Sequence, residues 1–347
     1  MQRTLLPANK KRRKEEPYYN SIPCQMSLKS KKGTPCKHMA YFALPSGKYV
    51  CGQHSANEKT VRRKLVKDPE AASRRVFELK SHAESVERRK KKNAAAGRRG
   101  TLTCFRMTMM GSVPLKKGAM NVFPNNKHEN RKDGYGCCEL SPMRLGPVKH
   151  RQPGLPEAEN IENYHQFNKV WPCETDEEGN PTKEFRKRRK SGYEDPEPRR
   201  HKFDAATTKK LREEANGENK KPQPSYCLHL DLDGEEMRFT YVQSRYFYCR
   251  AYEALAKRTR SFEILKKALD DGYDLCICGY DAYQVTNDLR HHYRDPKKPF
   301  GHELVLYTLL TVEEGEVYPW RRYRFDRPEV YENVASMLVA EDDDYDE

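Results

Sequence analysis

Alternation of apolar and polar residues predicts a β-hairpin in the last third of this 347-residue chain. Residues 227–232 alternate, Asp233-Gly234 follows, and residues 237–242 alternate again. An Asp-Gly pair between two such segments is a strong hairpin signal, because glycine accepts the positive φ that a tight turn requires. We therefore expect two antiparallel strands joined by Asp233-Gly234.

Helical spacing follows the hairpin. Over residues 247–270 the apolar residues recur as on one face of a helix, which Gly272 is suited to end: they are Phe247, Ala251, Leu255, Phe262, Leu265 and Leu269. The apolar run at 275–278 predicts a short buried strand that leads into Gly279-Tyr280-Asp281. Gly301-His302-Glu303 then opens another helix, whose apolar residues are Leu304, Leu306, Leu309 and Leu310.

Earlier parts of the chain are less regular. Residues 57–99 read as a helix interrupted by Pro69, with Val76, Leu79, Ala83 and Val86 at helical spacing, and 94–100 as a linker. Residues 102–175 have poor periodicity, so we expect irregular but ordered structure wrapped on a core. Residues 176–224 are charged and rich in Pro, which indicates a surface excursion or a long loop. Together these elements predict an α+β fold, mostly helical with a β-hairpin.

Charge divides the chain. Residues 1–100 contain 26 Lys and Arg against 8 Asp and Glu, whereas the remaining 247 residues contain 40 against 43. We expect a disordered basic tail at 1–20, a Cys/His segment at 21–56, a basic helix and linker at 57–100, a globular domain at 101–330 with a charged insertion at 176–224, and an acidic tail at 331–347. The acidic tail either folds back on the basic region or is a solvating end.

Composition points to an intracellular protein. No apolar run is long enough to span a membrane, and the charged N-terminus does not resemble a secretory signal. The basic run at 10–14 is either a nuclear import signal or a solubilising stretch. The 11 cysteines are unevenly placed, and we interpret them as reduced thiols apart from one cluster.

That cluster consists of Cys24, Cys36, Cys51 and His54, spaced C-x11-C-x14-C-x2-H. Zinc requires four such ligands in a tetrahedron, and the closing C-x2-H places two of them on one tight turn. The surrounding segment has few other residues from which to build a core, so the metal would supply folding energy. His38 is a substitute ligand, and the alternative is a pair of buried thiols beside unrelated polar residues. A closed four-ligand set implies a structural site.

The helix expected at 57–99 is dense in Lys and Arg. Such a helix would neutralise several phosphates and release their counterions, which gives salt-sensitive binding to nucleic acid with little sequence preference. Aromatic residues are nearly absent, so a phosphate grip is favoured over base stacking. The alternatives are an acidic protein, a membrane surface, or simply a solvated helix.

A third pattern lies at residues 162–169. Glu162, Gln166 and Lys169 share one face of a helix, where a carboxylate, an amide and an amine could hold a sugar and its leaving group. Spacing alone also fits a solvated surface.

Several motifs resemble the NADAR superfamily, with the match covering about residues 102–320. They are Leu140-Ser141-Pro142, Gly146-Pro147-Val148, Ile161 to Lys169, Ser244 to Cys249 with Tyr252, Leu275 to Asp281, and Pro299 to Glu303. The arrangement also resembles uncharacterised proteins of large DNA viruses of algae and amoebae. The insertion and the hairpin depart from the family pattern.

The resemblance implies an N-glycosidase that acts on ADP-ribose or related N-glycosides, including ADP-ribose attached to DNA bases. It implies catalytic roles for Glu162, Lys169 and Asp281, and substrate binding by Gln166, His302 and Arg245. From the sequence alone, Asp281 is equally a turn residue, and His302 a cap or a core histidine. The competing hypothesis is a non-catalytic protein, nuclear, cytoplasmic or carried in a virion, that binds nucleic acid through residues 1–100.

Overall fold

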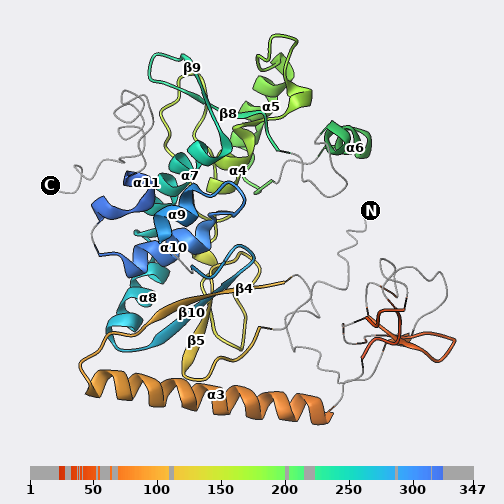
Figure 1. The fold of residues 1–347 in the computed structure, drawn as a ribbon, viewed down its shortest axis with the longest axis vertical. Coiled ribbons are helices and arrows are strands. Elements are labelled where there is room, and N and C mark those ends of the chain that lie inside the picture. The colour runs from red at the N-terminus through yellow and green to blue at the C-terminus, as the bar shows by residue number, and fades with distance from the viewer. Residues whose placement is uncertain are drawn as a thin grey trace, which may run out of the picture.

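The computed structural model describes the parts of the chain drawn in colour in Figure 1, namely residues 23–27, 33–36, 38, 40, 42–51, 54, 63–64, 69–108, 113–199, 203–214, 223–285, 288–313 and 315–322. The tails expected at 1–20 and 331–347 lie outside these residues. Helices combine with parallel and antiparallel sheets, so the predicted α+β class is confirmed.

A small antiparallel sheet organises the Cys/His segment. Its strands are β1 (Phe42–Ala43), β2 (Tyr49–Val50) and β3 (Arg63–Lys64), in the order β2-β1-β3. The prediction of helix at residues 63–64 is therefore wrong, because their backbone pairs with β1. The helix α3 (Pro69–Ala95) begins only at Pro69, whose missing N–H costs nothing in a first helical turn.

Four parallel strands form the central sheet, in the order β4-β10-β5-β6. They are β4 (Leu102–Arg106), β10 (Asp274–Gly279), β5 (Ala119–Phe123) and β6 (Tyr135–Gly136). β10 is buried at every position, as predicted. The prediction of irregular structure for residues 102–175 is wrong for the other three strands. Strands covered on both faces, such as β5, carry no alternation to reveal them.

The basic helix α3 lies across the amino-terminal ends of β5 and β10 (Figure 1). Asn93 Nδ2 donates to the Gly272 carbonyl at 2.9 Å, and His82 Nε2 lies 3.0 Å from the Ala119 carbonyl. Of the predicted apolar stripe only Val86 is buried; Leu79 is half-buried, and Val76 and Ala83 are exposed. The helix therefore packs against the central sheet.

A second, antiparallel sheet contains the predicted hairpin. β8 (Tyr226–Leu230) and β9 (Glu236–Phe239) pair around Gly234, whose φ is +91°. β7 (Lys169–Val170) extends this sheet on the other side of β8. Residues 240–242 leave the hairpin, because Thr240 caps the next helix through the N–H of Gln243.

The described part of the charged insertion is largely helical. It forms α5 (Lys183–Glu194) and α6 (Ala205–Glu214). α5 packs against α4 (Ile161–Phe167), and Phe185 and Tyr193 are fully buried. The prediction of an excursion is wrong for α5, because two buried aromatic side chains anchor this otherwise charged helix.

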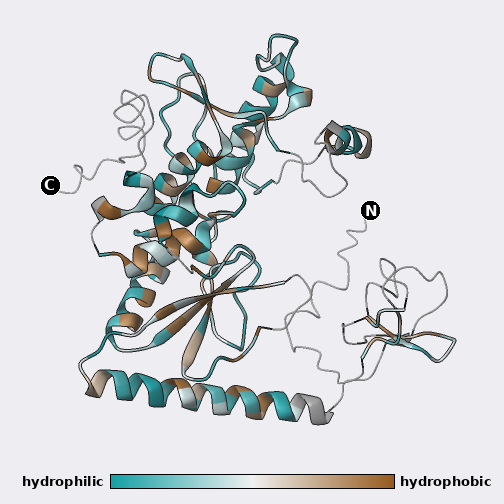
Figure 2. Cartoon of the chain, in the orientation of Figure 1, coloured by the Kyte–Doolittle hydropathy of each residue, from teal (hydrophilic) through white to brown (hydrophobic). Residues whose placement is uncertain are grey.

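Helices complete the core around the central sheet. They are α7 (Tyr241–Ala256), α8 (Arg260–Asp270), α9 (Leu289–Arg294), α10 (His302–Thr311) and α11 (Pro319–Arg322), with 3-10 turns η1 (Cys138–Leu140), η2 (Pro172–Glu174) and η3 (Gly315–Val317). The helix expected over 247–270 is broken, because the Thr259 hydroxyl caps α8 through the Phe262 N–H. α10 buries all four predicted leucines, each worth about 1.5–3 kcal/mol. Figure 2 shows apolar residues concentrated in the strands and inner helices, while α3 is mostly hydrophilic.

Candidate functional site

Cys24, Cys36, Cys51 and His54 come together in the N-terminal segment, as predicted. All four are buried, and their ligand atoms lie within 4.8 Å of one another. His54 Nδ1 is 3.3 Å from the sulfurs of both Cys24 and Cys51. The segment closes through backbone hydrogen bonds, in which the Cys24 N–H donates to the His38 carbonyl and the Cys36 N–H to the Met26 carbonyl.

The donor set suits a structural metal ion. A tetrahedral ion bound at about 2.3 Å to sulfur and about 2.1 Å to nitrogen would hold those atoms about 3.6 Å apart, close to the separations found. All eleven cysteines lie in the described residues and none of them forms a disulfide, so no disulfide competes for these sulfurs. His38 is not part of the group, which makes the predicted substitute ligand unnecessary.

The predicted triplet forms a buried hydrogen-bonded chain. Gln166 Nε2 donates to Glu162 Oε1, and Lys169 Nζ donates to Gln166 Oε1, both at 3.1 Å. Glu162 and Lys169 are 7% and 8% exposed, so this is not a solvated surface. Asn160 starts α4 by accepting from the Asn163 N–H, and Lys169 lies just beyond the helix in β7. The charges at the two ends fix the orientation of the Gln166 amide.

A second group of polar side chains lies at the carboxyl end of the central sheet. Asp281 follows β10, and its backbone N–H donates to Glu303 Oε1 at 3.4 Å. An added Cβ at Gly301 would lie 3.1 Å from Glu303 Oε2 and 3.4 Å from Asp281 Oδ2, so both carboxylates border this glycine. His302 Nδ1 is 3.2 Å from Glu303 Oε2, and its Nε2 is 3.1 Å from the Pro124 carbonyl after β5. The carboxyl ends of parallel strands are where open sheets commonly bind ligands.

Two tyrosines of α7 connect these groups. Burial raises the pKa of Tyr241, and the negative charges of Asp281 and Glu162 raise it further. Burial likewise raises the pKa of Tyr248 well above its usual value, with added contributions from Glu162 and Glu303. The ammonium of Lys169 lies 5.5 Å from the centre of the Tyr241 ring. The carboxylates of Glu162 in α4, Asp281 after β10 and Glu303 in α10 therefore all act on tyrosines of α7.

Arg245 makes hydrogen bonds to the backbone. Its guanidinium donates to the carbonyls of Tyr293, Asp295 and Lys298 at 2.5, 3.2 and 2.7 Å. These bonds hold the segment that leads from α9 to α10, and the side chain is buried. Three of its N–H donors are therefore directed at backbone carbonyls, and substrate binding by Arg245 stays a prediction.

Sequence reasoning gave no role to Glu303, Tyr241 or Tyr248. Glu303 is 1% exposed, although it stands in the first turn of a helix, where carboxylates are usually solvated caps. The sequence signal for Glu303 is the glycine in Gly301-His302-Glu303, because the absence of a Cβ at Gly301 leaves room for the Glu303 carboxylate. Gly279 gives the same indication, because an added Cβ there would lie 2.1 Å from Glu303 Oε1. The two tyrosines carry no local signal.

The exposed face of α3 is cationic, as predicted. Arg88 to Lys92 form a continuous basic run near its carboxyl end, where positive charge also complements the helix dipole. This end of α3 lies beside the amino-terminal ends of β5 and β10, opposite the carboxylates at the other end of the sheet.

Comparison with known protein families, curated proteins and solved structures finds no match to this chain. Within the described ranges, none of the helices has both the length and the apolarity needed to cross a membrane.

Proposed function

We propose that the polar group around α7 is the active site of an N-glycoside hydrolase that acts on an ADP-ribose-type substrate. The observation that carries this proposal is the buried Glu162–Gln166–Lys169 chain, whose carboxylate acts, together with those of Asp281 and Glu303, on the tyrosines of α7. Burying several charged groups is costly unless they serve one another or a ligand. The motifs that resemble NADAR proteins contribute all of these residues.

The reaction replaces the bond between the anomeric carbon and a base nitrogen with a bond to a water oxygen. The C–N bond breaks with its electron pair on the nitrogen, which takes up one proton, and the anomeric carbon passes through an oxocarbenium-like state. Glu162 stabilises that positive charge and accepts a proton from the attacking water. The His302–Glu303 pair supplies the proton to the departing nitrogen.

The other residues position the substrate and the general base Glu162. Gln166 orients the Glu162 carboxylate through its amide N–H. Lys169 fixes the opposite end of Gln166 and offers positive charge to the diphosphate of the ligand. Asp281, beside Gly301, accepts hydrogen bonds from the ribose hydroxyls.

The test compares wild type with Glu162→Gln on DNA that carries ADP-ribose on a base, with free ADP-ribose as the measured product. Glu159→Gln is the matched control, because Glu159 is exposed and lies just before α4. We expect release by wild type and the control, and a loss of about 10²–10⁴-fold in Glu162→Gln. Equal rates in all three proteins, or none in wild type, would contradict the proposal.

We also propose that the ion of the Cys/His segment is zinc, since three thiolates and one imidazole are a common structural zinc set. Metal analysis of purified protein should find about one zinc per chain, and Cys51→Ser should reduce this strongly. Cys173→Ser is the control, because Cys173 is exposed and outside the cluster. A metal-free wild type with normal helix content would refute the assignment.

Nucleic-acid binding through residues 1–100 is a second candidate function, favoured by the exposed basic run of α3. It is compatible with hydrolysis, because it would bring the active site to a modified nucleic acid. Nucleic-acid binding would also be a function by itself, in a non-catalytic protein that binds nucleic acid or is carried in a virion.

A further inference from the structure

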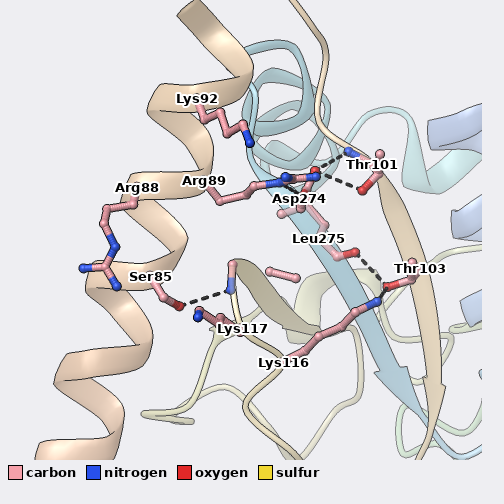
Figure 3. Close-up of a pocket in the computed structure, with 12 residues that line it drawn as sticks. Ser85, Arg88, Arg89, Lys92, Thr101, Thr103, Lys116, Lys117, Asp274 and Leu275 are labelled. Atoms are coloured by element: carbon pink, nitrogen blue, oxygen red, sulfur yellow. Dashed lines mark hydrogen bonds and ion pairs between the residues drawn. The ribbon is translucent and has the colours of Figure 1, made fainter. Parts of the chain in front are cut away.

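A cleft of about 500 Å³ lies between α3 and the start of the central sheet (Figure 3). One wall is the basic end of α3. The other wall is formed by Thr101, Thr103 and the loop at residues 116–118. The cleft therefore joins the N-terminal basic region to residues of the body, and its volume is within the range of ligand sites.

Hydrogen bonds hold the 116–118 loop against α3. The Gly118 N–H donates to Ser85 Oγ at 3.1 Å, and His82 Nε2 lies 3.1 Å from the Lys116 carbonyl. Gly118 has a φ of +80°, and an added Cβ would lie 3.2 Å from Arg89 Cβ, so glycine permits this close approach. The two walls are thus fixed relative to each other before any ligand binds.

The cleft has a large excess of positive charge. Its cationic side chains are Arg88, Arg89, Lys92, Lys116 and Lys117, and its single carboxylate is Asp274. Both carboxylate oxygens of Asp274 already accept hydrogen bonds, one from Arg89 Nε at 2.8 Å and the other from the Thr101 N–H at 2.8 Å. Among the described residues, no carboxylate forms an ion pair with Lys92 or Lys117. The remaining cations repel one another until an anion enters.

The directions of the side chains suit a run of phosphates. In Figure 3, Lys92 and Arg89 extend from α3 toward the sheet, and Lys116 runs along the sheet to Thr103. Arg88 lies on the outer flank of the helix and continues the positive charge beyond the cleft. None of the described residues that line this cleft is aromatic, so among them bases find no stacking partner.

We propose that this cleft binds the phosphates of a nucleic-acid backbone. Lys116 and Lys117 of the body would contact the phosphates together with the basic residues of α3. The inference rests on the second candidate function and gives it a location, while it does not depend on glycoside hydrolysis. Nucleic-acid binding is then not a property of the first hundred residues alone.

The test measures binding of a short fluorescein-labelled DNA duplex to the full chain by anisotropy, between about 50 and 200 mM salt. The variant is Lys116→Ala/Lys117→Ala, in which both side chains are exposed, so the fold should survive. The control is Lys183→Ala/Lys187→Ala, which removes the same charge from exposed positions of α5, at the opposite end of the molecule in Figure 1. Circular dichroism confirms that both variants are folded.

We expect the cleft variant to reduce the slope of log K against log salt by about 1–2, as loss of one or two phosphate contacts requires, and the control to change it much less. Equal slopes for the two variants would overturn the cleft but not binding through residues 1–100. No binding by wild type would overturn both. Displacement of the duplex by polyglutamate as efficiently as by unlabelled DNA would overturn the nucleic-acid assignment in favour of an acidic peptide.

Discussion

Replacing Asp274 with Asn should detach α3 from the body. Asp274 lies at the start of β10 and is 8% exposed. Its Oδ1 accepts from the Thr101 N–H, the Thr101 hydroxyl and Asn93 Nδ2 at 2.8, 2.9 and 3.2 Å, and its Oδ2 accepts from Arg89. One carboxylate therefore joins α3, β4 and β10.

The magnitude follows from these contacts. A hydrogen bond to a charged group contributes about 1.5–3 kcal/mol, against about 1 kcal/mol for a neutral one, so an Asn oxygen weakens each of three buried bonds by about 1 kcal/mol. Arg89 is 45% exposed, and its solvent-screened ion pair adds at most about 1 kcal/mol. We expect Asp274→Asn to lower the free energy of unfolding by about 3–4 kcal/mol. Arg89→Gln alone should cost about 1 kcal/mol or less.

The assay is urea unfolding of each variant, followed by circular dichroism, with hydrogen exchange of the α3 amides as a local measure. Amides of residues 82–95 should exchange much faster in Asp274→Asn than in Arg89→Gln. Equal, small effects of the two substitutions would show that the exposed ion pair, and not the buried carboxylate, secures the helix. That result would refute the reasoning.

The same residue predicts a dependence on pH. Burial opposes the charged form, but the Thr101 N–H and Arg89 outweigh it, so the pKa of Asp274 lies below its usual value. Its contribution is fully present above the unfolded pKa of about 3.9 and is lost as pH falls through the folded pKa. The difference between wild type and Asp274→Asn should therefore be constant at neutral pH and shrink only below about pH 4.

Two further predictions concern the upper part of the molecule. Gly192→Ala in α5 should lower the free energy of unfolding by about 1–3 kcal/mol in urea titrations, because the added Cβ would lie 2.2 Å from the buried Phe167 ring. In an exposed helix the same change usually raises stability by about 1 kcal/mol. Such a gain here would show that the packing around Gly192 is looser than described. Burial lowers the pKa of His150 to about 4. As the pH falls, His150 is therefore protonated from about pH 6.5 in the unfolded chain but only near pH 4 in the folded chain. Stability should fall by up to about 3 kcal/mol across that window, and His150→Gln should flatten this slope; an unchanged slope would show that His150 titrates normally in the fold.

Sequence patterns predicted those helices and strands that are determined by residues close together in the chain. The hairpin rests on Asp233-Gly234, and α10 rests on four leucines at helical spacing, so each was visible in a short window. β5 was not visible, because a strand buried on both faces does not alternate. The break between α7 and α8 was missed, since the cap at Thr259 competes with an apolar pattern that continues across it.

The candidate site was predictable in the same limited way. Spacing placed Glu162, Gln166 and Lys169 on one face, and the structure joins them in one chain. That Glu162 and Glu303 both act on Tyr248 depends on how α4 and α10 pack on α7, which no spacing reveals. The docking of α3 was missed for the same reason, because Asn93 and Asp274 are 181 residues apart in sequence.

The proposed active site requires carboxylates from α4 and α10, distant in sequence, to act on one substrate. The decisive measurement is a double-mutant cycle of Glu162→Gln and Glu303→Gln, followed as kcat/KM for ADP-ribose release from modified DNA. Residues that act as a unit give strongly non-additive losses, so we expect a double variant about as slow as the slower single variant. Losses that multiply, as for two independent sites, would contradict it.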